Sequence, residues 1–129
     1  MKKLLILLFS ILILPSSVNA SDVYYCSDDD NTGYDVSENL EHAMFGLGKF
    51  KIMLDFDNKN VISEEKSFTS DFNQSCYYNF NDDTLYCFND VGSAFSINKF
   101  TLRYFYADLY NKRILNNDPR LAYGTCEKF

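Results

Sequence analysis

Several residue types that carry chemistry are scarce in this sequence. It has no tryptophan, one histidine, two prolines and five glycines among 129 residues. A nucleophile–histidine pair would have to use His42, and no Gly-x-Ser-x-Gly elbow accompanies it. No glycine-rich phosphate loop follows an apolar strand, and no two cysteines have the C-x-x-C spacing of zinc or thioredoxin-type sites. We therefore predict no catalytic residues, no metal ligands and no cofactor, and a protein that is not an enzyme.

Basic residues are also few. The sequence has 12 Lys and Arg against 18 Asp and Glu, which gives a net charge of −6. A protein that binds nucleic acid through its phosphates needs a basic surface, so nucleic acid is not an expected partner. The acidity suits a cationic protein partner, although solubility alone also explains it.

The first twenty residues have the composition of an export signal. Lys2 and Lys3 precede an apolar run over residues 4–14, and Val18-Asn19-Ala20 offers small residues to a signal peptidase. The run is shorter than the about 20 apolar residues that span a membrane. We expect cleavage after Ala20, one soluble domain over residues 21–129, no membrane contact after cleavage, and a periplasmic or secreted location.

Tyrosine and phenylalanine, by contrast, are abundant, with 10 and 12 residues. Together with many asparagines, they are typical of strands joined by Asn/Asp turns. The clearest strand covers residues 50–56, in which Phe50, Ile52, Leu54 and Phe56 alternate with more polar positions. A turn at residues 57–60 then predicts a hairpin over 50–63. We predict an all-β fold, a small antiparallel β-barrel or sandwich of six to eight strands, stapled by two disulfides.

Residues 76–110 are predicted to form three or four consecutive antiparallel strands. For the hairpin that follows residue 92, two registers are open. A turn at residues 98–99 pairs Phe95 with Leu102, whereas a turn over 98–101 pairs Phe95 with Tyr104. Both registers place the same apolar side chains on one buried face and Arg103 and Phe105 on the other. The buried set is Phe95, Ile97, Leu102, Tyr104 and Tyr106.

Four cysteines in an exported chain indicate two disulfides. A two-residue turn at Asn81-Asp82 sets Cys76 opposite Cys87, although a bulge or a turn reaching Thr84 is the alternative. A last strand is predicted over residues 120–123, so Cys26 and Cys126 would join the first and last strands. This nested pairing is one of three that four cysteines allow.

The segment after Cys26 has the composition of a polar loop. Asp28 and Asp30 occupy the first and third positions of an EF-hand loop, but Asn39 stands where that loop needs a bidentate carboxylate. An ordinary acidic turn is therefore favoured. Residues 34–48 are open to two interpretations, a single helical turn after Ser37 or an irregular strand and loop.

Two kinds of binding site follow from these patterns. In the first, aromatic side chains line a barrel mouth that holds a small apolar ligand; the alternative is that they fill the core. In the second, Asp28, Asp29 and Asp30 form an exposed loop that engages a cationic protein; the alternative is a solvated loop. Arg103, Tyr104 and Tyr106 are further candidate contacts. The aromatic lining would consist of Tyr24, Phe50, Phe95, Tyr104 and Tyr106.

The hairpin F95-S-I-N-K-F-T-L-R-Y104, followed by G124-T-C126, resembles that of small exported bacterial proteins without a known activity. Those share F-x-[IL]-N-x-x-T-L-R-[FY] and a terminal G-x-C. The Tyr24-Tyr25-Cys26 start and the late Cys126 are also similar to those of membrane-bound C-type lysozyme inhibitors. That family implies a small periplasmic β-barrel with a terminal disulfide and a basic lysozyme as partner. Its lysozyme-contacting motifs S-G-x-x-Y and Y-x-x-x-T-K-G are missing from this chain.

We therefore expect an exported β-domain that binds a ligand or a protein without catalysing a reaction. A periplasmic inhibitor of a cationic hydrolase such as lysozyme is the alternative, and a small hydrolase with an unrecognised site is the third hypothesis. The favoured places for a binding site are the acidic loop after Cys26 and residues 34–48.

Overall fold

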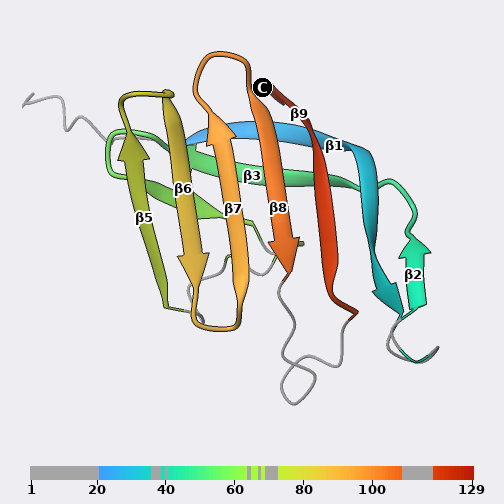
Figure 1. The fold of residues 1–129 in the computed structure, drawn as a ribbon. Coiled ribbons are helices and arrows are strands. Elements are labelled where there is room, and N and C mark those ends of the chain that lie inside the picture. The colour runs from blue at the N-terminus through green and yellow to red at the C-terminus, as the bar shows by residue number, and fades with distance from the viewer. Residues whose placement is uncertain are drawn as a thin grey trace, which may run out of the picture.

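The computed structural model describes residues 21–35, 39, 41–63, 65, 66, 68, 73–108 and 118–129. Within them it contains nine strands and no helix (Figure 1). The described part therefore has no helix long and apolar enough to cross a membrane. The predicted export signal lies outside the described residues. The strands are β1 Asp22–Asp35, β2 Glu41–Met44, β3 Lys49–Asp55, β4 Asn60–Ile62, β5 Gln74–Asn79, β6 Thr84–Asn89, β7 Ser93–Asn98, β8 Arg103–Asp108 and β9 Arg120–Lys128.

All nine strands belong to one antiparallel sheet in the order β4-β3-β1-β9-β8-β7-β6-β5, with β2 attached to β1. Strands β5 to β9 stand side by side, and β1 curves over them so that β3 and β4 lie behind (Figure 1). The sheet thus forms a nearly closed barrel. Its two edge strands are joined by the Gln74 amide, which donates to the Asn60 side chain and, at 2.9 Å, to the Val61 carbonyl oxygen. The all-β prediction is confirmed, with nine strands instead of six to eight.

The two hairpins expected around residues 50–63 and 76–87 are both present, although the turn of the first covers residues 56–59 instead of 57–60. Leu54 faces Val61 across β3 and β4, and Cys76 faces Cys87 across β5 and β6. The second hairpin has a four-residue turn over residues 80–83, which is longer than the two-residue turn expected but ends before Thr84, since Thr84 pairs with Asn79. Asp83 has a φ of 51° there, a conformation that Asn and Asp adopt more readily than most residues.

The β7–β8 hairpin has neither of the two predicted registers. Phe95 faces Tyr106, because the turn extends over residues 99–102. The Asn98 side-chain oxygen accepts hydrogen bonds from the amides of Phe100 and Thr101 at 3.0 and 2.9 Å, and these contacts stabilise the longer turn. The shift is two residues, so every side chain keeps its predicted face.

Strand β1 corrects the prediction of a polar loop after Cys26. Residues 22–35 are one continuous strand, with a bulge between Asp28 and Asp30 in its pairing with β9. A bulge bends its strand and increases the twist, so the acidic stretch serves the curvature of the barrel. The strand interpretation is also the right one for residues 41–44, which form β2 and pair with β1. Strand β9 extends through Cys126, beyond the predicted 120–123.

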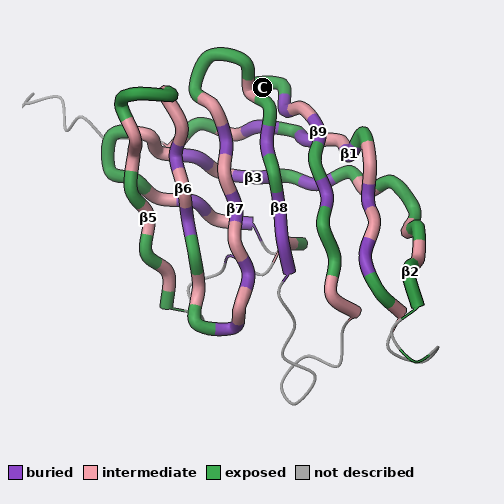
Figure 2. Tube along the Cα trace, in the orientation of Figure 1, coloured by how far each residue is buried: buried purple, intermediate pink, exposed green. Residues whose placement is uncertain are grey.

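Both predicted disulfides are confirmed. Cys26–Cys126 joins the adjacent strands β1 and β9, and Cys76–Cys87 joins β5 and β6. Buried positions alternate with more exposed ones along strands such as β3 and β7 (Figure 2). Phe68, from the connection between β4 and β5, is fully buried and contacts the rings of Phe95 and Tyr106 at centroid distances of 6.0 and 6.4 Å. The apolar interior is therefore packed.

Candidate functional site

The five aromatic side chains expected to line an apolar cup are all in this core, each at most 5% exposed. They do not line one common cup, because Tyr24, Phe50 and Tyr106 each border a different pocket. Tyr104 packs against Phe50 and Phe95, with ring centroids 5.2 and 5.9 Å apart. The structure therefore gives Tyr104 and Tyr106 structural positions in the core, and Arg103 alone of the three candidate hairpin residues is exposed.

The three aspartates expected in an exposed loop are separated by the strand geometry. Asp28 is buried and only 5% exposed, Asp29 is exposed, and Asp30 is half-buried. The prediction of an exposed acidic loop is therefore wrong, because alternate side chains of a strand point to opposite faces. Asp28 faces the barrel interior.

Asp28 is held by groups from three distant segments. One carboxylate oxygen accepts a hydrogen bond from the Tyr104 hydroxyl, and the other accepts one from the Gly48 amide at 2.8 Å. The Lys66 ammonium lies 3.8 Å away. A buried carboxylate without partners would be strongly destabilising. Burial, and then this hydrogen bond to Asp28, raise the pKa of Tyr104 far above its usual range.

Lys66 connects this cluster to a pocket. Its ammonium lies over the faces of Phe50 and Tyr106, 4.6 and 4.8 Å from the ring centroids, in positions typical of cation–π contacts. Its side chain is 13% exposed. Burial lowers the pKa of Lys66, and the nearby Asp28 carboxylate opposes that shift.

The pocket, which we call the lysine pocket, has a volume of about 160 Å³. The Asp108 carboxyl is buried in it and accepts a hydrogen bond from the Ser93 hydroxyl at 3.3 Å. Burial raises the pKa of Asp108, whereas hydrogen bonds from Ser93 and Tyr106 oppose the shift. The lining residues are Asn31, Glu65, Lys66, Tyr106, Asp108, Asp118, Arg120 and Ala122.

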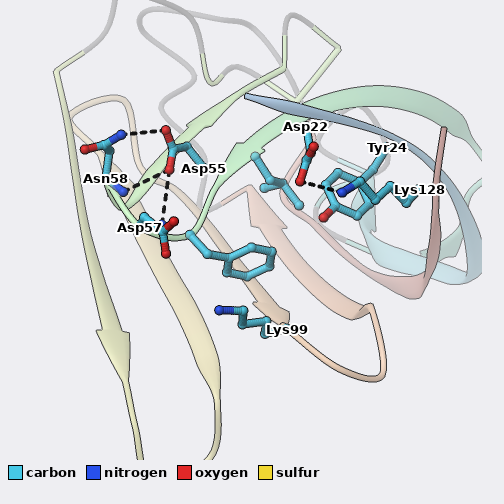
Figure 3. Close-up of a pocket in the computed structure, with 9 residues that line it drawn as sticks. Asp22, Tyr24, Asp55, Asp57, Asn58, Lys99 and Lys128 are labelled. Atoms are coloured by element: carbon cyan, nitrogen blue, oxygen red, sulfur yellow. Dashed lines mark hydrogen bonds and ion pairs between the residues drawn. The ribbon is translucent and has the colours of Figure 1, made fainter. Parts of the chain in front are cut away.

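A second pocket, of about 320 Å³, is lined by residues of β1, β3, β9 and two turns (Figure 3). Two groups of its polar residues already bind one another. Lys128 and Asp22 form an ion pair at 2.7 Å. Asp55 accepts hydrogen bonds from the amides of Asn58 and Asp57 at 2.9 and 3.1 Å, and these bonds, first of all those from Asn58, lower the pKa of Asp55. These contacts stabilise a turn and a strand pair.

The only histidine of the sequence contacts a threonine on the neighbouring strand. The Nε2 of His42 lies 2.7 Å from the Thr32 hydroxyl, on the exposed strand β2. That hydroxyl donates its proton to the Ala43 carbonyl oxygen at 3.2 Å. These contacts join the paired strands β1 and β2 at the surface.

The outward side of strands β5 to β9 carries a feature that the sequence did not reveal. The strand registers place one residue from each strand in a single row, namely Tyr77, Tyr86, Ser96, Phe105 and Tyr123. Tyr77 stacks on Tyr86, with ring centroids 5.2 Å apart and planes at 16°. Phe88 and Leu121 adjoin the row and are 47% and 39% exposed. We call Tyr77, Tyr86, Phe88, Phe105, Leu121 and Tyr123 the aromatic face.

The aromatic face has few charges in a protein with 18 acidic residues. The outward positions of β5 to β8 carry Arg103 and no carboxylate, and Glu127 lies towards the end of β9. Part of this face could have been predicted. Because Cys76 and Cys87 point inward, Tyr77 and Tyr86 must point outward. The full row could not, since it depends on four strand registers.

No protein family matches the chain, and no curated protein or solved structure matches it. The class of the protein therefore rests on its own structure, which is a small all-β barrel stapled by two disulfides. No group of three or more potential metal ligands occurs in the described part of the chain.

Proposed function

We propose that the protein is an exported binding module without catalytic activity, and that its aromatic face binds another protein. The observation that carries this proposal is the exposure of Tyr77, Phe88, Phe105 and Tyr123, at 43–51%, on a surface with few carboxylates. One of these, Asp82, accepts a hydrogen bond from the Tyr86 hydroxyl at 2.7 Å at the edge of the face. Contiguous exposed apolar patches of this kind mark interaction sites. Interface centres are rich in Tyr, Phe and Arg and poor in Asp and Glu, as this face is.

The cysteines support an oxidising, exported compartment. Two disulfides are typical of the periplasm or the extracellular space, where thiols are not kept reduced. Together with the predicted export signal, they support a periplasmic or secreted location.

Phe105 and Phe100 make a matched test of this function. Phe105 lies in the middle of the aromatic face, whereas Phe100 is 73% exposed in the β7–β8 turn and outside it. Oxidised protein covering residues 21–129 would be immobilised and exposed to the exported proteins of the cell that makes it. A partner retained by the unchanged protein should also be retained by Phe100→Arg. Phe105→Arg should weaken its binding about 30-fold, because truncating a central anchor costs about 2 kcal/mol.

Retention of the same partner by Phe105→Arg and by Tyr123→Arg, with affinities equal to that of the unchanged protein, would refute this function. An equal loss of partner binding in Phe100→Arg and Phe105→Arg would also refute it. Melting temperatures of all variants within a few degrees of each other would show that the barrel is intact.

The alternative is an inhibitor of a cationic hydrolase such as lysozyme. The net charge of −6 supports it, because opposite charges speed association. Native mass spectrometry with a basic lysozyme, combined with a lysis assay, tests it directly. A complex accompanied by loss of lysis supports the inhibitor. If neither a complex nor a loss of lysis is found at micromolar concentrations, this alternative is refuted.

A further inference from the structure

The lysine pocket contains a buried acceptor that the protein leaves without a donor. Asn31 is 6% exposed, and its Oδ1 has no hydrogen-bond partner. Its Nδ2 donates to the Gly46 carbonyl oxygen at 3.1 Å. Because a carbonyl oxygen can only accept, this bond fixes which end of the amide is the oxygen. Buried polar groups normally have partners, so Oδ1 requires a donor from within the pocket.

The same pocket contains cations that can accept an anionic group. The Lys66 ammonium has three N–H donors, and its 3.8 Å separation from Asp28 is too long for a hydrogen bond. The rings of Phe50 and Tyr106 also contact it, the Asp108 carboxyl attracts it and the Arg120 guanidinium repels it. Arg120 adds a second positive charge, and its guanidinium lies 4.1 Å from the centre of the Phe45 ring.

The strand registers explain how these groups share one space. Asn31 on β1 and Tyr106 on β8 lie on either side of Ala122 on β9. In the neighbouring inward row, Arg120 faces Asp108. The small Ala122 side chain leaves room between the larger ones. The pocket therefore has two cations, an unpaired amide oxygen, the buried Asp108 carboxyl and two further carboxyls, at Glu65 and Asp118, around one volume.

The volume limits the size of a ligand. About 160 Å³ corresponds to about five water molecules. Drug-sized ligands occupy about 300 Å³ or more. A simple anion would bind Lys66 and Arg120 but would offer no hydrogen-bond donor to Asn31 Oδ1. A simple amine would satisfy Asn31 and Asp108 but would offer no acceptor to the N–H donors of the Lys66 ammonium.

We propose that the lysine pocket binds a free α-amino acid with a small side chain. Its carboxylate faces Lys66 and Arg120, and its ammonium donates to Asn31 Oδ1 and to Asp108. The pocket opens on the inside of the sheet, whereas the aromatic face is on its outside. This inference is therefore independent of the protein-binding function proposed above.

Calorimetric titration of the oxidised chain tests the proposal. Glycine, L-alanine and L-serine would be compared with acetate and ethylammonium, which each carry half of the recognised groups. We expect saturable binding of the amino acids and at least about tenfold weaker binding of both fragments. Lys66→Met should weaken amino-acid binding at least about tenfold. Lys99→Met is the matched control, because Lys99 also lies over two aromatic rings, in a different pocket.

Three results would overturn the proposal. The first is that none of the three amino acids binds saturably up to about 10 mM. The second is that acetate binds as tightly as glycine. The third is that the unchanged protein and Lys66→Met bind the amino acids with equal affinity. If Lys66→Met does not fold, Arg120→Gln replaces it, since Arg120 is exposed and its loss leaves the core unchanged. Unweakened binding to that variant would equally contradict the proposal.

Discussion

The hydrogen bond between Tyr104 and the buried Asp28 carboxylate should be measurable as stability. Tyr104→Phe removes the hydroxyl and leaves the ring, so the packing against Phe50 and Phe95 is retained. A hydrogen bond to a charged group contributes about 1.5–3 kcal/mol. We expect the free energy of unfolding at pH 7 to fall by about 2 kcal/mol, a large share of the about 5–15 kcal/mol typical of a domain.

The same variant predicts a pH dependence with a definite sign. Burial raises the pKa of Tyr104 in the folded protein far above the value of about 10 in the unfolded chain. The folded state therefore keeps a proton that the unfolded state loses, and stability falls as the pH rises above about 10, by about 1.4 kcal/mol per pH unit. Phenylalanine cannot ionise. The difference of about 2 kcal/mol between the two proteins should thus disappear near pH 11.5.

Urea unfolding followed by far-UV circular dichroism, with both disulfides formed, measures this difference between pH 7 and 11.5. Tyr123→Phe is the control, because Tyr123 is 44% exposed and its loss of a hydroxyl should change stability by less than about 0.5 kcal/mol. A Tyr104→Phe effect no larger than that of the control at pH 7 would refute the role of the bond. A difference that stays constant from pH 9 to 11.5 would refute the titration argument.

Three further predictions concern the barrel itself. Gly124→Ala would place a Cβ 2.0 Å from a carbonyl oxygen of β1, and should lower the free energy of unfolding, measured in urea, by about 3 kcal/mol. Gly46→Ala is the control, because a Cβ there would have nothing within 4 Å and should leave the free energy of unfolding almost unchanged. Phe68→Ala should lower stability by about 3–5 kcal/mol in the same assay, and a loss below about 2 kcal/mol would show that the side chain does not fill the core. Replacing the Cys26–Cys126 pair by alanines should destabilise by about 4.7 kcal/mol and replacing Cys76–Cys87 by about 2.8 kcal/mol, from their sequence separations of 100 and 11; the reverse order would contradict the chain-entropy argument.

The parts of the fold that could be predicted are those written in local patterns. Alternation over residues 50–56 located β3, and the spacing of Cys76 and Cys87 located the β5–β6 hairpin. The inward face of β8 was also predicted although its register was not. A shift of two residues changes every pairing but leaves each side chain on the same face.

The parts that could not be predicted depend on contacts between distant residues. Asp28 has the local sequence of a loop, and the groups that allow its burial are 20, 38 and 76 residues away, at Gly48, Lys66 and Tyr104. The lysine pocket likewise combines Asn31 with residues that follow it by more than 30 positions. Nothing near Asn31 in the sequence indicates that its amide oxygen is left without a donor.

The Cys26–Cys126 disulfide lies at the place where this barrel differs from a simple up-and-down meander. The start of β1 and the end of β9 lie together, since Lys128 pairs with Asp22 and the Phe129 amide donates to the Val23 carbonyl oxygen at 2.9 Å. If β9 led directly into β1, the sheet order would read β5-β6-β7-β8-β9-β1-β3-β4, an up-and-down meander apart from the short β2. The barrel is therefore a circular permutation of a meander, whose gap between β4 and β5 falls in the middle of the chain.

This permutation has an energetic consequence. In a meander, a short turn would bring β1 beside β9, whereas here about 100 residues must close before the two strands meet. Closing about 100 residues instead of a turn of about 5 costs about 2.7 kcal/mol more in loop-closure entropy. A covalent bond between Cys26 and Cys126 offsets a penalty of this size. The disulfide thus takes the place of the hairpin turn that the permuted chain lacks.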